Sequence, residues 1–381
     1  MDNLFSTVKL DQSGSIKGLI SAIENALAAG AQSLCIFACS SNHLPKEQID
    51  PYLQRLSVPV FGGLFPGIIY HQQEVSRGTL VYGLRWRLPM LTVTDLDQAA
   101  DGLEQALAES PELRERDDFL VFVDGLSRGI DELLGQLYNQ LGPDKQFIGG
   151  GAGSLKLEQA PCLFSNQGLI ENAAQVVALP GRLSLGVRHG WKELAGPFLV
   201  TEAEGNTIHT LNYKPAYNLY REAIESMSPL RFEQSDFFSI AKNFPLGVER
   251  LNEEILIRDP VRVDGSALVC VGRVPDHAMV YLMRGEADNL IAAAEEATDI
   301  AKAGCKGKTV GALLFDCISR TLFLEEHFDE ELGRVAARLP LDCELAGALT
   351  LGEIASSSQG GVHFLNKTLA TGLLWEPPLD D

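Results

Sequence analysis

The sequence predicts an α/β protein of two domains, with mixed sheets flanked by helices and built from repeated strand–helix–strand–hairpin modules. The first observation is a repeated motif, because Arg77–Trp86 and Asn366–Trp375 share Thr-Leu-x-x-Gly-Leu-x-Trp. The second is that each copy follows a glycine turn, Phe61–Ile69 in one case and Ala346–Ile354 in the other. A long self-similar unit indicates one structural module that is used several times.

An apolar run that ends in small polar residues precedes each glycine turn. These runs are Leu34–Ser41 and Ala312–Arg320. A third, looser copy lies between them, with the run Phe119–Arg128 followed by Phe147–Gly153. Repeated modules tend to bring equivalent loops together, so we expect a site where these loops meet.

The elements follow from apolar spacing, Pro starts and Gly turns. Strands and helices alternate in the first half, and paired strands become frequent from Arg182 onward. A hairpin is expected between 162–164 and 175–179, around the Gly168 turn. In chain order, we expect helices at 18–29, 45–56, 97–108, 130–141, 214–226 and 288–303, and strands at 34–38, 58–61, 79–84, 90–93, 119–123, 146–148, 162–164, 175–179, 198–202, 208–211, 267–271 and 278–283.

We place the domain boundary where the character of the chain changes. The expected domains are residues 1–185 and 186–381, with the third module occupying 309–375. The tail from Glu376 is expected to fray.

Composition excludes several classes of protein. The net charge of −20 argues against nucleic acid as a partner, which needs clustered Lys and Arg, and against anionic membranes. The seven cysteines include no Cys-x-x-Cys and no zinc spacing, so disulfides and structural zinc are not expected. With no signal peptide or spanning segment in view, the sequence predicts a soluble, cytoplasmic protein.

The glycines Gly149, Gly150 and Gly151 follow a strand, where backbone amides can cradle an anion. The segment lacks the Walker ending and does not match Gly-x-Gly-x-x-Gly, so dinucleotide binding is not expected. Two interpretations stay open: a tight crossing of helix and strand, or direct contact with a ligand. Gly62, Gly149, Gly347 and Gly352 recur at equivalent module positions, which favours convergence on a cleft.

Polar residues follow the apolar strand that ends at Phe315. Arg320 is suited to a two-pronged clamp on a carboxylate, and it is equally suited to a structural ion pair with Asp316. Cys317 is either a small buried residue or a nucleophile. Glu353, after Gly352, is either exposed or bound to a cationic group, because burying it alone would be costly.

Two histidines lie in loops of the first module. His43 follows the first apolar run, and His71 follows the Gly67 turn. Each is either an ordinary surface histidine or the axial ligand of a haem. Gly-x-Ser-x-Gly is absent, so the hydrolase elbow has no support.

At these segments the chain resembles the FIST family of bacterial sensory domains, over nearly its whole length. The resemblance is carried by these segments: Phe147–Gly153, Val200–Ile208, Lys214–Tyr220, Leu314–Arg320 and Ala346–Ile354. It departs from the family at Gly62–Ile69, where a polar, acidic turn has become apolar.

The resemblance implies a small-ligand sensor that is not an enzyme and signals to a partner in trans, such as a histidine kinase. It also implies, as an alternative, a haem-based nitric oxide sensor with His43 or His71 as axial ligand. The expected ligand site is a cleft between modules with no metal, formed by Gly149, Gly150, Gly151, Asp316, Cys317, Arg320, Gly352 and Glu353. The alternative from another class is a small-molecule enzyme that uses Cys317 or Asp316.

Overall fold

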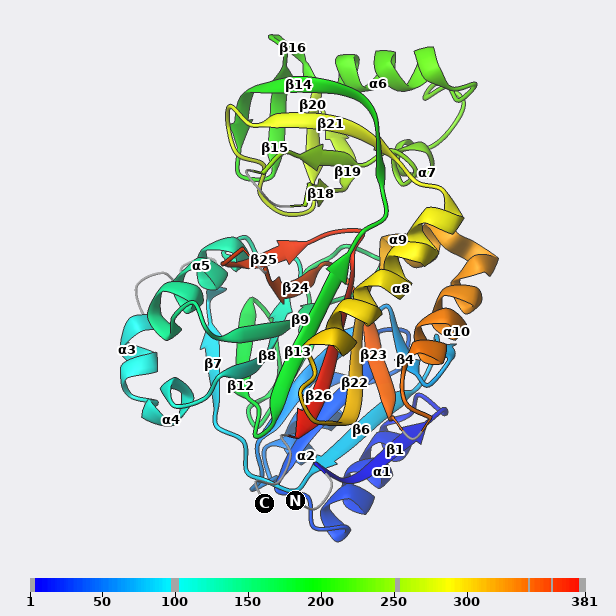
Figure 1. Cartoon of the computed structure of the whole chain (residues 1–381). Helices are drawn as coiled ribbons and strands as arrows, with labels where there is room; N and C mark the ends of the chain where they lie inside the picture. The colour runs from blue at the N-terminus through cyan, green and yellow to red at the C-terminus, as the bar shows by residue number, and fades with distance from the viewer. Residues whose placement is uncertain (1–3, 97–102, 251–253, 342, 358, 377–381) are drawn as a thin grey trace.

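The computed structural model describes residues 4–96, 103–250, 254–341, 343–357 and 359–376. Within these residues the strands form three six-stranded sheets and one eight-stranded sheet. The three smaller sheets, with helices on their outer faces, make the body of the molecule, and the larger sheet stands apart at one end (Figure 1). Mixed sheets flanked by helices and built from repeated modules are thereby confirmed.

The first module contains two helices and six strands among the described residues. Ser15 caps its first helix by accepting a hydrogen bond from the Gly18 amide at 3.1 Å. Its second strand, which reads Ser-Leu-Cys-Ile-Phe-Ala-Cys, is buried throughout, as a central strand between two layers should be. The elements are β1 Phe5–Asp11, α1 Ile16–Ala28, β2 Ser33–Cys39, α2 Lys46–Leu53, β3 Val60–Phe65, β4 Gly67–Tyr70, β5 Gln73–Val75 and β6 Thr79–Leu84.

The second module repeats this plan. Its helix α5 buries an apolar stripe against the sheet, including Leu133, Leu134 and Leu137. The helix expected at 97–108 is present from Leu103, and residues 97–102 lie outside the described residues. The elements are β7 Met90–Thr94, α3 Leu103–Ala108, α4 Pro111–Arg114, β8 Asp118–Asp124, α5 Ile130–Leu141, β9 Gln146–Ala152, β10 Leu163–Ser165, β11 Gly168–Ile170 and β12 Ala173–Ala178.

The third module is interrupted after its first strand. Its elements are β13 Arg182–Arg188, α8 Ala287–Gly304, β22 Lys308–Cys317, α9 Ile318–Leu324, α10 Phe328–Arg338, β23 Leu345–Thr350, β24 Glu353–Ser356, β25 Val362–Leu365 and β26 Leu369–Glu376. The boundary expected between residues 185 and 186 falls inside β13, which pairs along its length with β26. The tail beyond Glu376 lies outside the described residues.

Residues 192–284 form an inserted domain between β13 and α8, built on the eight-stranded sheet. Its strands follow the order β18-β17-β21-β14-β15-β20-β19, with β16 beside β15. The bounds are β14 Lys192–Glu204, β15 Thr207–Leu211, β16 Lys214–Pro215, α6 Ala216–Met227, α7 Phe237–Ala241, β17 Leu246–Val248, β18 Leu256–Arg258, β19 Pro260–Asp264, β20 Ala267–Cys270 and β21 Met279–Arg284.

Each module gives a hairpin to the sheet of another module. The β4–β5 hairpin of the first module pairs with β23 of the third, and β24–β25 of the third pairs with β9 of the second. The β10–β11 hairpin of the second module pairs with β3 of the first. The three modules are therefore exchanged in a ring, with pseudo-threefold symmetry.

This exchange corrects the hairpin expected between 162–164 and 175–179. β10 pairs with β11 across the Gly168 turn, as the turn residue suggested. β12, however, pairs within the sheet of its own module, where it lies between β7 and β8. The sequence shows where a strand is, and not which sheet receives it.

Three glycines mark equivalent positions in the modules. Gly62, Gly149 and Gly347 each lie opposite a central-strand residue, and a Cβ on them would sit 2.1, 1.8 and 1.7 Å from that residue's carbonyl oxygen. Only glycine allows this close approach. The equivalence of these three turns is thus confirmed by strand pairing.

The literal match of the Thr-Leu-x-x-Gly-Leu-x-Trp motif is one residue out of register. Val81 lies opposite Ile36, whereas Thr371 lies opposite Leu314, and the glycines make Ile36 and Leu314 equivalent. A shift of one residue turns a side chain to the other face of a sheet. Leu80 accordingly packs in the central core, and Leu369 packs in the core beneath the outer helices.

Three phenylalanines meet where the three sheets face each other. Phe37, Phe122 and Phe315 come from the equivalent strands β2, β8 and β22, one residue after those that face the glycines. Their ring centroids are 5.6, 5.9 and 6.1 Å apart in edge-on arrangements. All three side chains are buried completely, so the body of the molecule is closed around this cluster.

We expect Phe122→Ala to lower the free energy of unfolding by about 3–5 kcal/mol, because truncating a fully buried ring leaves a cavity between three sheets. Phe198→Ala, at a half-buried ring in the inserted domain, should cost less. Urea denaturation followed by circular dichroism measures both. An equal loss in the two variants would contradict a central role for the phenylalanine cluster.

Candidate ligand-binding site

The structure brings the expected site residues into one region. Gly149–Gly151 lie in β9, and Gly150 pairs directly with Glu353 of β24. The Gly151 amide donates to the Gly352 carbonyl at 2.8 Å. A Cβ on Gly150 would lie 2.5 Å from the Thr350 methyl group, so this glycine serves a close backbone crossing.

Glu353 is buried completely. Its Oε1 accepts a hydrogen bond from the Thr350 hydroxyl at 2.6 Å, and its Oε2 accepts one from the Thr368 amide at 3.2 Å. Burial raises the pKa of Glu353 to about 8, although both hydrogen bonds favour the ionised form. The equivalent positions in the other modules are Ile68 and Leu163, so the carboxyl is peculiar to the third module.

Arg320 is also buried completely, and its guanidinium group contacts several protein groups. Its Nε lies 3.0 Å from an Asp316 carboxylate oxygen, and it forms an ion pair with Glu331 of α10. It also donates to the His189 carbonyl at 2.7 Å and to the Leu290 carbonyl at 3.2 Å. Of the two interpretations left open by the sequence, the structural ion pair is the one observed.

Asp316 and Glu331 both lie against Arg320 with no exposed surface. Burial first, and then the negative charge of Glu331, raises the pKa of Asp316 well above its ordinary value. This shift favours the protonated form of Asp316 within the cluster. This arrangement keeps the buried cluster close to neutral.

Cys317 is 4% exposed, and burial together with nearby Glu353 raises the pKa of its thiol well above the ordinary value. A nucleophilic cysteine needs the opposite shift, because the thiolate is the reactive form. The environment of Cys317 and Asp316 thus gives no support to an enzyme built on them.

A second buried ionic cluster joins the third module to the inserted domain. The Lys367 ammonium lies 3.3 Å from Asp259, donates to the Lys242 carbonyl at 2.9 Å and lies 5.0 Å from the Trp191 ring centre. Asp259 also accepts from the Ser319 hydroxyl at 2.7 Å. No motif in the sequence indicates this cluster, because its members are scattered along the chain.

The haem alternative depends on His43 and His71, and both side chains are exposed. His71 stacks beside Tyr70 with ring centres 4.1 Å apart. Phe65, in the apolar segment 62–69 of the same module, is buried completely against Phe37 and Phe122. Neither imidazole is set in an apolar pocket, so these residues do not fit an axial haem ligand.

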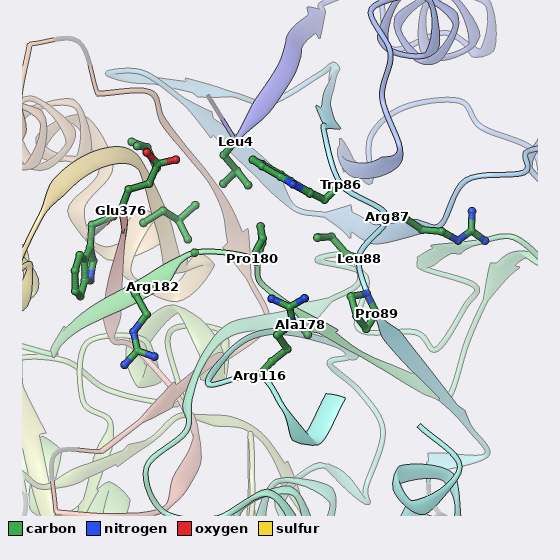
Figure 2. A pocket seen from close by; sticks show the side chains of 14 residues that line it. Leu4, Trp86, Arg87, Leu88, Pro89, Arg116, Ala178, Pro180, Arg182 and Glu376 are labelled. Atoms are coloured by element: carbon green, nitrogen blue, oxygen red, sulfur yellow. The ribbon is translucent and has the colours of Figure 1, made fainter. Parts of the chain in front are cut away.

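A cavity of about 430 Å³ lies beside Leu4 and Glu376, the first and last of the described residues (Figure 2). None of the eight expected site residues lines it. Its walls are mostly apolar, and the charged residues among them are three arginines and one glutamate. The lining residues are Leu4, Trp86, Arg87, Leu88, Pro89, Arg116, Ala178, Pro180, Gly181, Arg182, Val310, Leu374, Trp375 and Glu376.

The cavity forms where the modules join. Residues 86–89 connect β6 to β7, and residues 178–182 connect β12 to β13. Leu4 lies just before β1, and 374–376 end β26. Trp86 and Trp375, the last residues of the repeated motif, both line it. The two tryptophans of the repeated motif therefore marked the cavity, although the sequence alone showed them only as part of a repeat.

The arginines of the cavity wall differ in their surroundings. Arg87 donates to the Ser57 carbonyl at 2.8 Å, and Arg182 forms an ion pair with Asp117. Figure 2 shows both guanidinium groups directed outward, whereas Arg116 reaches toward the middle of the cavity.

Comparison with known families now gives the identity of the fold. The FIST N domain matches residues 33–214, and the FIST C domain matches residues 216–356. The chain belongs to the FIST family. None of the curated proteins compared with it matches the chain.

FIST domains are associated with signal transduction and small-ligand sensing, and they are sensory and not catalytic. The two FIST matches meet at residues 214–216, within the inserted domain. Among the described residues of this FIST protein, no helix has the length and apolar character needed to span a membrane.

We expect Arg320→Ala to destabilise this FIST protein by about 3–5 kcal/mol, because two buried acids lose their cation. Arg334→Ala removes an exposed arginine that pairs with Glu330 and Glu295 on the helical surface, and should cost far less, because water and salt screen exposed ion pairs. Chemical denaturation compares the two variants. Similar small losses would show that the Arg320 cluster is not a structural core.

Glu353→Gln should change how stability depends on pH. The folded-state pKa of Glu353 is about 8 against 4.5 in the unfolded chain, so between these values the folded protein holds a proton that the unfolded chain releases. Glu353 therefore lowers the free energy of unfolding as pH rises from about 4.5 to about 8. Glutamine cannot ionise, so the stability of the variant relative to wild type should increase across that window. A constant difference in urea denaturation between pH 5 and 8 would contradict the raised pKa.

Proposed function

We propose that the protein is a small-ligand sensor whose ligand binds in the cavity at the module joints. The observation that carries the proposal is the cavity itself, which has mostly apolar walls and a few charged groups among its lining residues. Its volume of about 430 Å³ is in the range of small-molecule sites. Binding here replaces the expected cleft at Gly149–Gly151, Arg320 and Glu353, where the Arg320 and Glu353 side chains are buried completely and contact other protein groups.

The position of the cavity suits a sensor. Both module linkers and the ends of β1 and β26 contribute to its wall, so one ligand would contact all three modules. A ligand shifts a conformational equilibrium only by its differential affinity for the two states. A site shared by three modules supplies that difference whenever their packing changes.

β26 offers a route from the cavity to the buried clusters. Its last residues, 374–376, line the cavity, and its first, Leu369, follows Lys367 and Thr368 directly. Lys367 binds Asp259 of the inserted domain, and the Thr368 amide binds Glu353. A displacement of this strand would therefore reach the contacts that hold the inserted domain, and from there a partner in trans such as the histidine kinase that the family suggests.

The neutral probe N-phenyl-1-naphthylamine tests the site, because its fluorescence rises in apolar surroundings. We expect saturable binding to wild-type protein and its loss in Gly181→Leu, which fills the cavity. A Cβ at Gly181 would lie 3.6 Å from its nearest neighbour, the Trp375 carbonyl, so the variant should keep its melting temperature.

Gly135→Leu provides the control, since a side chain there points into open space on α5. It should bind the probe as wild type does. Absence of binding to wild type, or equal binding by Gly181→Leu, would overturn the proposed site.

A further inference from the structure

We infer that the cavity selects an organic anion with an apolar body, a carboxylate above all, and that Arg116 is the residue that selects it. This inference rests on the proposed function and names the class of ligand. It depends on three features of the cavity: the basic side chains in its lining, the state of Arg116, and the apolar character of the remaining wall.

The first feature is charge. The chain as a whole carries 51 acidic and 31 basic side chains. The lining of the cavity differs, because it holds three arginines and a single carboxylate, that of Glu376, although Asp117 and Asp118 lie beside Arg182. In a strongly acidic protein, basic side chains gathered in the lining of one cavity attract anions to that place.

The second feature separates Arg116 from its neighbours. Asp117 and Asp118 lie close to Arg182, whose charge is thereby compensated, and Arg87 is used by the Ser57 carbonyl. Within the part of the chain that the structure describes, the Arg116 guanidinium has neither an ion pair nor a hydrogen bond. It points inward between Pro89 and Pro180 (Figure 2).

The third feature is the wall that the ligand body would meet. Leu4, Leu88 and Leu374 are buried and present hydrocarbon to the cavity, and Trp86 presents a large ring. Such a wall favours an aliphatic or aromatic body over a sugar or a zwitterion. The two halves of the site together fit an amphiphile with one anionic end, since a guanidinium fork binds a carboxylate through two hydrogen bonds.

Displacement of N-phenyl-1-naphthylamine by matched eight-carbon competitors tests the inference on full-length protein. Octanoate should displace the probe at a concentration about tenfold lower than octanol, because only the acid gains a charge-assisted hydrogen bond. Octylamine should be the weakest of the three. Raising the salt concentration should weaken octanoate and leave octanol unchanged, since Arg116 is exposed to screening.

Arg116→Gln should bring octanoate and octanol to within about twofold of each other. Arg114→Gln is the matched control, because it removes the same charge two residues away, at the end of α4 and off the cavity wall. It should keep the wild-type preference. Arg116→Lys, which retains the charge, should keep part of it.

The outcomes separate the two proposals. Equal displacement by octanoate and octanol in wild type, or equal loss of preference in Arg116→Gln and Arg114→Gln, overturns anion selection and leaves the sensor site standing. Failure of the neutral probe to bind overturns the site and with it this inference. The comparison of octanoate with octanol on wild-type protein needs no variant, so it tests anion selection even if a substitution prevents folding.

Discussion

The structure depends on the packing of three sheets around Phe37, Phe122 and Phe315. Each ring comes from the central strand of one module, so no module can bury its inner face without the other two. Apolar faces of sheets must be covered, and here they cover one another. The exchange of hairpins adds a second dependence, because the two strands at one edge of each sheet belong to another module. The unit of folding is therefore the ring of three modules.

The sequence predicts positions that only one residue type can occupy. It does not predict features that are formed by segments far apart in the chain. Gly62, Gly149 and Gly347 were paired correctly, because only glycine permits the backbone approach found there. The Leu80 and Leu369 pairing was one residue out, because a pattern of apolar letters does not fix the face of a strand. The cavity was missed because its wall comes from joints between modules. Those segments have no motif of their own apart from the two tryptophans.

The expected site shows how a correct grouping can carry a different role. Asp316, Cys317, Arg320 and Glu353 do meet beside the Gly149–Gly151 strand. All four side chains are buried, and the raised pKa values of Asp316 and Glu353 favour the uncharged forms of both carboxyl groups. The spacing of motifs along the chain predicts that these side chains converge. It does not predict that protein covers them, because the covering element is α10, whose Glu331 pairs with Arg320. No local sequence pattern links α10 to β22.

The buried charges are concentrated in the third module, which is also the module that carries the inserted domain. Where that module has Glu353, the others have Ile68 and Leu163, and an apolar residue there would pack more cheaply. Buried ionic contacts give little net stability, but they define one arrangement, because a small displacement leaves a charge unpaired. Lys367, through its contacts with Asp259 and the Lys242 carbonyl, thus fixes the inserted domain in one position relative to β26. The last residues of β26 line the cavity. A ligand that shifts this strand slightly would therefore disturb the buried contacts of Lys367 and Thr368, which tolerate little movement.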